Sequence, residues 1–143
     1  MEGVSDVDSF TINGSKFGID GNKSRLAFAR TAGGTFTMDL IVYGEPSTYA
    51  RLAEGPAWSW SLYPPKFYLN DYPVPNADGF VVHLTAEDYE DYDTAIYMME
   101  HNPIESVVVR VTHGSRVEAR GKVALSGRMV EFSICWTAAE AAA

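Results

Sequence analysis

Apolar and polar residues alternate with a period of two through most of this chain, and no other feature of the sequence constrains the fold as strongly. In the clearest example, Val117, Val123 and Leu125 occupy alternate positions of a run whose intervening residues include Glu118 and Arg120. Such alternation places the apolar side chains on one face of a β-strand and the polar side chains on the other. The sequence therefore predicts a mostly β protein in which each strand buries one face.

Short turns separate the alternating segments, which indicates that neighbouring strands run antiparallel. Asn13-Gly14 and Gly33-Gly34 are pairs that tolerate positive φ and commonly connect the two strands of a hairpin. With 143 residues, of which 46% are apolar, the chain has the size of one domain with a continuous core. We expect a single domain over residues 1–143, with residues 137–143 as a frayed tail. An antiparallel meander that forms a sandwich or a barrel fits the pattern equally well.

One segment has a different period. Tyr89, Tyr92, Ile96 and Met99 recur at intervals of three, four and three residues, which is the spacing of an amphipathic helix. A threonine hydroxyl that can act as the N-cap and two acidic residues of the first turn precede this stripe. The pattern predicts one amphipathic acidic helix near residues 86–101.

The negative charge of the chain is concentrated in one part of it. The net charge is −8, and between Phe67 and Val109 there are nine acidic residues and no lysine or arginine. We call residues 67–109 the acidic segment. It would repel nucleic acid and an anionic membrane surface, and it would attract a basic protein. We therefore expect no nucleic acid and no membrane among the partners.

The first functional hypothesis is a non-enzymatic interaction protein that binds a basic protein partner through the acidic face of the expected helix. In its physical type, such a protein is comparable to a small acidic immunity protein or inhibitor. The candidate contact residues lie off the apolar stripe and are Glu87, Glu90, Asp91 and Asp93. In the alternative arrangement, basic side chains of the same molecule cover the helix, and the charge asymmetry then marks no partner site. Those basic residues are Arg110, Arg116, Arg120, Lys122 and Arg128.

The second functional hypothesis rests on a run of aromatic residues in the middle of the chain. Aromatic rings on the exposed face of a sheet can stack on ligands, so this run suggests a β-barrel or sandwich that binds a small ligand or a carbohydrate. The candidate residues for this site are Trp58, Trp60, Tyr63, Tyr68 and Tyr72. Trp58 and Trp60 alternate with serines, however, and this spacing favours burial of both indole rings in the core.

The familiar signatures of catalysis and of metal binding do not occur in the sequence. There is no G-x-S-x-G, H-E-x-x-H or G-x-x-x-x-G-K-[ST] motif, which favours a protein that is not an enzyme. His83, His101 and His113 have no local ligand spacing, and the acidic residues after Thr85 do not fit an EF-hand loop. We therefore expect no metal and no cofactor.

Cysteine usage and hydropathy bear on the compartment. Cys135 is the only cysteine, so no intramolecular disulfide can form, and a lone thiol favours a reducing compartment. The first residues carry neither a basic leader nor an apolar run, and no apolar run approaches the ~20 residues needed to span a bilayer. The expected localisation is cytoplasmic.

Overall fold

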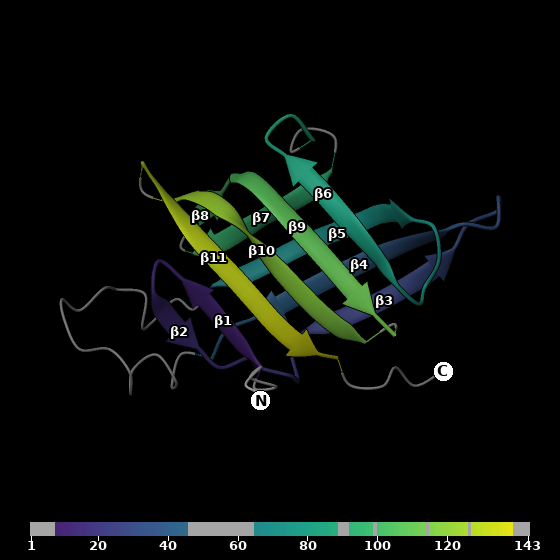
Figure 1. Ribbon diagram of the computed structural model, residues 1–143, viewed down its shortest axis with the longest axis horizontal. Helices are drawn as coiled ribbons and strands as arrows, with labels where there is room; N and C mark the ends of the chain where they lie inside the picture. Colours follow the sequence, from purple (N-terminus) through teal and green to yellow (C-terminus); the bar gives the residue numbers. More distant parts are fainter. Residues whose placement is uncertain are drawn as a thin grey trace.

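The computed structural model describes residues 8–45, 65–88, 92–98, 100–113, 115–125 and 127–138, and these residues form two antiparallel β-sheets (Figure 1). The described strands are β1 (Ser9–Ile12), β2 (Ser15–Phe17), β3 (Arg25–Arg30), β4 (Phe36–Tyr43), β5 (Lys66–Val74), β6 (Phe80–Thr85), β7 (Asp93–Met98), β8 (Glu100–Asn102), β9 (Ile104–Thr112), β10 (Arg116–Leu125) and β11 (Arg128–Thr137). Among the described residues, no helix is long and apolar enough to cross a membrane.

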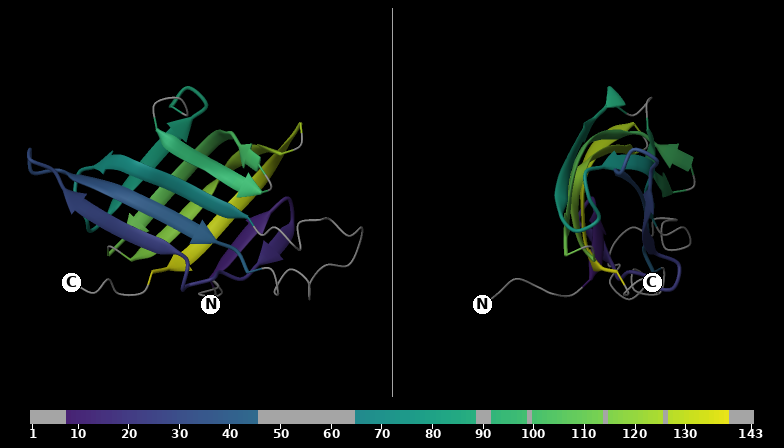
Figure 2. Two further views of the ribbon diagram at one scale, coloured as in Figure 1. Left: turned by 180° about the vertical axis from the view of Figure 1, so that it is seen from behind. Right: turned by 90° about the vertical axis from the view of Figure 1, so that its right-hand side faces the viewer.

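The two sheets pack face to face as an open sandwich and do not close into a barrel. The six-stranded sheet has the order β2-β1-β11-β10-β9-β6, and the five-stranded sheet has the order β3-β4-β5-β7-β8. The strands of the two sheets cross when the molecule is viewed through both layers (Figure 1), and the edge-on view shows two curved layers (Figure 2). The sequence expectation of a mostly β antiparallel fold is confirmed, and the sandwich is the alternative that the structure adopts.

The hydrophobic core lies between the sheets, where the apolar positions of each strand meet. Burial alternates strictly along β6 and along most of β10 and β11, as the period of two predicts. Phe67 of the five-stranded sheet packs against Phe132 of the six-stranded sheet with ring centroids 5.9 Å apart, and both side chains are almost completely buried. Trp136 is also buried, and Ala138 packs beside the core after the end of β11. Strand β11 also includes Thr137, which is the first residue of the tail that the sequence predicted.

The expected turns of the hairpins are present. Asn13 and Gly14 have φ values of 50° and 83° between β1 and β2, and Gly34 has a φ of 89° between β3 and β4. Glycine adopts this left-handed region at little cost, and asparagine tolerates it better than most residues. These two turns are confirmed, as is the meander of β9, β10 and β11.

The expected helix near residues 86–101 is wrong. Asp93–Met98 is strand β7, which pairs with Lys66–Asn70 of β5 on one side and with β8 on the other. Pairing with β7 gives partners to the backbone N–H and C=O groups at this edge of β5, which a helix could not do. Thr94, Ile96 and Tyr97 also suit a strand, and helix propensity is a weak preference that tertiary contacts override.

The turn before β7 is fixed by a local carboxylate. Residues 86–88 form a turn, and the Asp88 carboxylate accepts hydrogen bonds from the Thr85 backbone N–H at 2.9 Å and from its hydroxyl at 3.3 Å. The Thr85 and Asp88 pattern that looks like a helix start is thus used in a turn. Residues 89–91 lie outside the described part of the chain.

Strand β5 extends further than its prolines suggest. The sequence favours an irregular loop from Asn70 to Asp78, yet the strand continues to Val74 and includes Pro73 opposite Thr37 of β4. Proline lacks an N–H donor and is tolerated where no strand needs that donor. The pairing with β7 covers only Lys66–Asn70, so Pro73 lies beyond it.

Gly121 allows strands β9 and β10 to approach each other closely at a point where their register shifts. A Cβ atom at this position would overlap the Ser106 carbonyl oxygen and would lie 2.8 Å from the Val107 Cα. The register of the two strands changes between Lys122 and Val123, which marks a bulge in the ladder. A side chain at position 121 would therefore force backbone atoms apart.

We expect Gly121→Ala to lower the free energy of unfolding by about 2 kcal/mol, because overpacking against backbone atoms typically costs 1–3 kcal/mol. Gly21→Ala is the control, since a Cβ at Gly21 meets no atom within 4 Å. Urea unfolding of the two variants measures the difference. Equal unfolding midpoints for the two variants would contradict the close approach.

Candidate functional site

The outer face of the five-stranded sheet carries a row of aromatic and basic side chains drawn from four neighbouring strands. Tyr43 of β4 is paired with Lys66 of β5, Lys66 with Tyr97 of β7, and Tyr97 with His101 of β8. Their strand neighbours Val42, Phe67, Ile96 and Asn102 are buried on the inner side of the sheet. The period of two thus directs the members of the row away from the core. Tyr68, two residues after Lys66, shares this outer face.

We call Tyr43, Lys66, Tyr68, Tyr97 and His101 the tyrosine face. The Lys66 ammonium lies 5.5 Å from the ring centroids of Tyr43 and Tyr68 and 5.6 Å from that of Tyr97. The His101 ring meets Tyr97 and Tyr68 edge to face, with centroids 4.9 Å and 6.0 Å apart. These cation–π and ring contacts hold the five side chains as one cluster.

The cluster is accessible to solvent. Tyr97 is 38% exposed, His101 is exposed, and Tyr43, Lys66 and Tyr68 are half-buried. Large aromatic side chains normally stabilise a protein most when they are buried in its core. Several of them gathered on an outer face are therefore characteristic of a binding surface. The arrangement leaves ring area open for stacking.

Hydrogen-bonding groups continue the face along β5 and β7. Asn70 donates from its amide nitrogen to the Asp93 carboxylate at 2.9 Å, and the Asp71 backbone N–H donates to the Asp39 carboxylate at 2.7 Å. Each carboxylate retains further lone pairs, because an ionised carboxylate accepts about four hydrogen bonds. The tyrosine face therefore adjoins acceptors that can bind hydroxyl groups.

The structure separates the five aromatic residues that the sequence grouped. Tyr68 belongs to the tyrosine face, whereas Tyr72 packs against the core with its ring 4.7 Å from that of Tyr92. A bulge explains this difference, because Leu40 is opposite Leu69 while Met38 is opposite Tyr72, so β5 has one extra residue between these pairs. The extra residue reverses which side chains point inward. Trp58, Trp60 and Tyr63 lie outside the described residues.

The four acidic candidate residues do not share a helix face. Glu87 is exposed in the turn after β6, and Asp93 is exposed at the start of β7, where it accepts the Asn70 hydrogen bond. Glu90 and Asp91 lie outside the described part of the chain. The two placed carboxylates are therefore presented by a turn and by a strand.

The basic residues of the last third lie on the outer face of the six-stranded sheet. Arg110, Arg116, Arg120 and Lys122 alternate there with core residues of β9 and β10, and Arg128 is exposed at the start of β11. The described part of the chain contains one ion pair, between Arg116 and Asp8 at 3.8 Å. Within the described residues these cations thus do not cover Glu87 or Asp93.

Sequence reasoning did not find four members of the tyrosine face, namely Tyr43, Lys66, Tyr97 and His101. Tyr43 follows the buried Val42 in β4, and successive side chains of a strand point to opposite faces, so the outward position of Tyr43 was predictable. What the sequence does not contain is the order of strands that brings β4, β5, β7 and β8 together.

The three histidines lie on different elements of the fold. His101 lies on the tyrosine face, His83 is exposed on β6, and His113 occupies a turn with a φ of 55°. Within the described residues, no group of three or more histidine, cysteine, aspartate or glutamate side chains is arranged to hold a metal ion.

The comparisons with known proteins return no match. No family model fits the sequence, and no curated protein and no solved structure resembles it at a significant level. The functional argument for this chain therefore depends on its own geometry.

The environment of Tyr72 changes the pKa of its hydroxyl group. Burial raises the pKa of the Tyr72 hydroxyl above its usual range, and the nearby Tyr92 and Asp88 raise this pKa further. A raised pKa in the folded state means that the unfolded chain loses this proton first as the pH rises. The stability that depends on neutral Tyr72 is therefore present below about pH 10 and is lost as the pH rises through the folded pKa.

We expect Tyr72→Phe to reduce the loss of stability at alkaline pH, because phenylalanine has no proton to lose. The measurement is the urea midpoint of the natural protein and the variant at pH 8 and at pH 11. The midpoint of the variant should fall by less between these two pH values. Identical falls would show that the environment of Tyr72 does not favour its neutral form.

Proposed function

We propose that the protein is a non-enzymatic binding module that takes up a carbohydrate on its tyrosine face. The observation that carries this proposal is the in-register row of Tyr43, Lys66, Tyr97 and His101 on an exposed sheet face. Tyrosine rings offer a flat apolar surface with a polar hydroxyl at its edge, which suits a sugar ring that is apolar on its faces and polar around its rim.

The charges beside the row favour a carbohydrate over a nucleic acid. Asp39 and Asp93 lie along the same face, and their carboxylates would repel a phosphate backbone. The same carboxylates and the Asn70 amide can hydrogen-bond to sugar hydroxyl groups. The Lys66 ammonium adds a donor at the centre of the row.

The sandwich supports this role by holding the row in place. All five members of the tyrosine face lie on strands, and side chains on strands are positioned more precisely than side chains on loops. A ligand that binds there does not need to order a flexible segment first, so less binding energy is lost to conformational entropy.

We expect Tyr97→Ala to weaken polysaccharide binding about tenfold or more, because a sugar ring loses its stacking partner, and the loss of one aromatic ring that stacks on a nucleobase costs roughly 1–3 kcal/mol. Native gels that contain a soluble glucan, mannan or pectin measure the binding as retarded migration. Met129→Ala is the control, since Met129 is 51% exposed on β11 of the other sheet and should leave retardation unchanged. Failure of all three polysaccharides to retard the protein, or equal retardation of Tyr97→Ala, would contradict the proposal.

A second candidate function is the binding of a basic protein partner through the acidic segment. The supporting observation is that the basic side chains of β9 and β10 lie on the outer face of the six-stranded sheet and form no ion pair with the described acidic residues of that segment. The proposed contact residues remain Glu87, Glu90, Asp91 and Asp93, without the helix that the sequence suggested. The negative electrostatic potential of these carboxylates would mainly increase the rate of association with the partner.

We expect the double variant Glu87→Gln with Asp93→Asn to slow association with a basic partner and to change the stability of the fold little, because exposed charges contribute only tenths of a kcal/mol. The measurement is capture of the partner from an extract of the native cells, followed by association rates at low and high salt. The matched control is Glu118→Gln with Glu131→Gln, which removes the same charge from the opposite outer face. Equal loss of capture in both double variants would show that net charge alone is responsible.

A further inference from the structure

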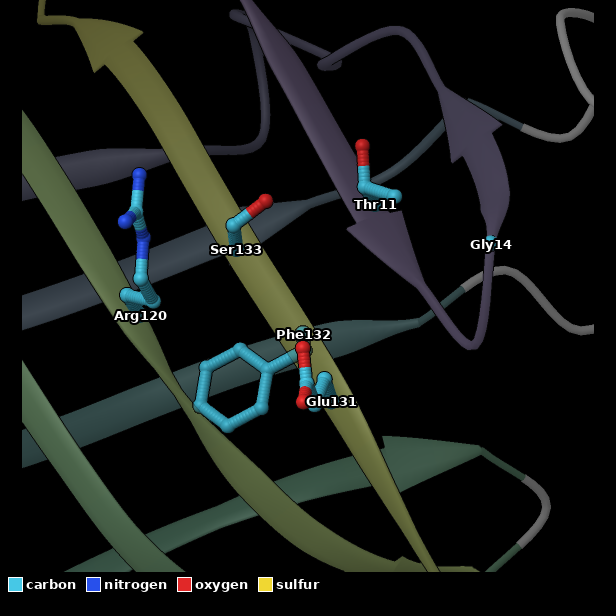
Figure 3. Close-up of a pocket in the computed structure, with 6 residues that line it drawn as sticks. All are labelled: Thr11, Gly14, Arg120, Glu131, Phe132 and Ser133. Carbon is cyan, nitrogen blue, oxygen red and sulfur yellow. The ribbon is translucent and has the colours of Figure 1, made fainter.

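The outer face of the six-stranded sheet contains two adjoining hollows that neither proposed function uses. One has a volume of about 370 Å³ and is lined by Thr11, Gly14, Arg120, Glu131, Phe132 and Ser133 (Figure 3). The second has a volume of about 390 Å³ and is also lined by Arg120 and Ser133. The two hollows therefore share these residues at their centre, and each is large enough for a small organic ligand.

Strand register places a cation and two hydroxyl groups side by side at this centre. Arg120 of β10 is opposite Ser133 of β11, and Ser133 is opposite Thr11 of β1. Figure 3 shows the three side chains on neighbouring strands, with the Phe132 ring turned away from the two hydroxyl groups. Neighbouring strands are ~4.8 Å apart, so one ligand group above Ser133 lies within reach of all three side chains.

Arg120 differs from Arg110 and Lys122, the nearby cations of this face, in its cross-strand neighbours. Arg110 is directly opposite Glu118, and Lys122 is directly opposite Glu131. Arg120 is directly opposite Val108 on one side and Ser133 on the other, so neither cross-strand neighbour is acidic. Its guanidinium group is exposed and takes no part in the one ion pair of the described residues.

We propose that Arg120, Ser133 and Thr11 form a binding site for a phosphate group, either free or carried by a small phosphorylated molecule. The planar guanidinium fork of arginine matches two phosphate oxygens, and the two hydroxyl groups donate to the remaining oxygens. Glu131 lines the first hollow and Glu118 lines the second, so phosphates placed further along this face from Ser133 would meet carboxylates, and a long polyanion fits the face poorly. The chemistry is thus that of a single phosphate group.

The test is a titration of the ¹⁵N-labelled full chain, followed by NMR, with inorganic phosphate and with phenyl phosphate. Chloride holds the ionic strength constant in both titrations, because electrostatic binding depends on salt. We expect saturable shifts of the Thr11, Arg120 and Ser133 amides. Tighter binding of phenyl phosphate, with added shifts at Val108 in the second hollow, identifies a phosphorylated organic molecule as the ligand. Equal affinity for the two probes identifies free phosphate.

One arginine variant and one lysine variant distinguish a specific site from general attraction between charges. Arg120→Gln should weaken phosphate binding at least tenfold. Lys122→Gln removes the same charge two residues away on the same strand and face, and it should change the affinity less than twofold. The absence of saturable shifts, shifts confined to other residues, or equal losses in the two variants would overturn the proposal. None of these results depends on polysaccharide binding at the tyrosine face.

Discussion

Each sheet of this protein is apolar on one face, so each needs the other to keep that face from water. The contact of Phe67 with Phe132 lies across the interface between the sheets, and the fully buried side chains come from both layers. Burial of such side chains stabilises a fold by about 1.5–3 kcal/mol each, so this interface makes the largest favourable contribution to the free energy of folding. Since the inner faces form the core, the described side chains that remain available for binding lie on the two outer faces.

The two outer faces differ in chemistry although they are built in the same way. The five-stranded sheet presents the tyrosine face beside carboxylates, and the six-stranded sheet presents arginine and lysine side chains opposite hydroxyl and acidic groups. The core holds the faces on opposite sides of the sandwich, so the charges of one do not cancel those of the other. This separation is why a carbohydrate site and a phosphate site are both compatible with one small chain.

Two local features show where sequence periodicity misleads. The spacing of Tyr92, Ile96 and Met99 fits a helix, but Thr94 and Ile96 also share one side of a strand, and the open edge of β5 selects the strand. Tyr68 and Tyr72 have the same parity in the sequence, yet the extra residue between Leu69 and Tyr72 sends their rings to opposite sides of the sheet. In both cases the pairing with a neighbouring strand, and not the local spacing, decides where the side chains lie.

The sequence by itself determined the β class, the antiparallel hairpins at Asn13-Gly14 and Gly33-Gly34, and the inward face of most strands. These properties are local, because a period of two and the φ preference of glycine act within a few residues. Only the tertiary structure decided the strand order, the use of residues 93–98 as a strand, and the meeting of Tyr43, Lys66, Tyr97 and His101 in one row. These depend on hydrogen bonds between segments far apart in the chain. The sequence of one segment does not specify which other segment becomes its neighbour in the sheet.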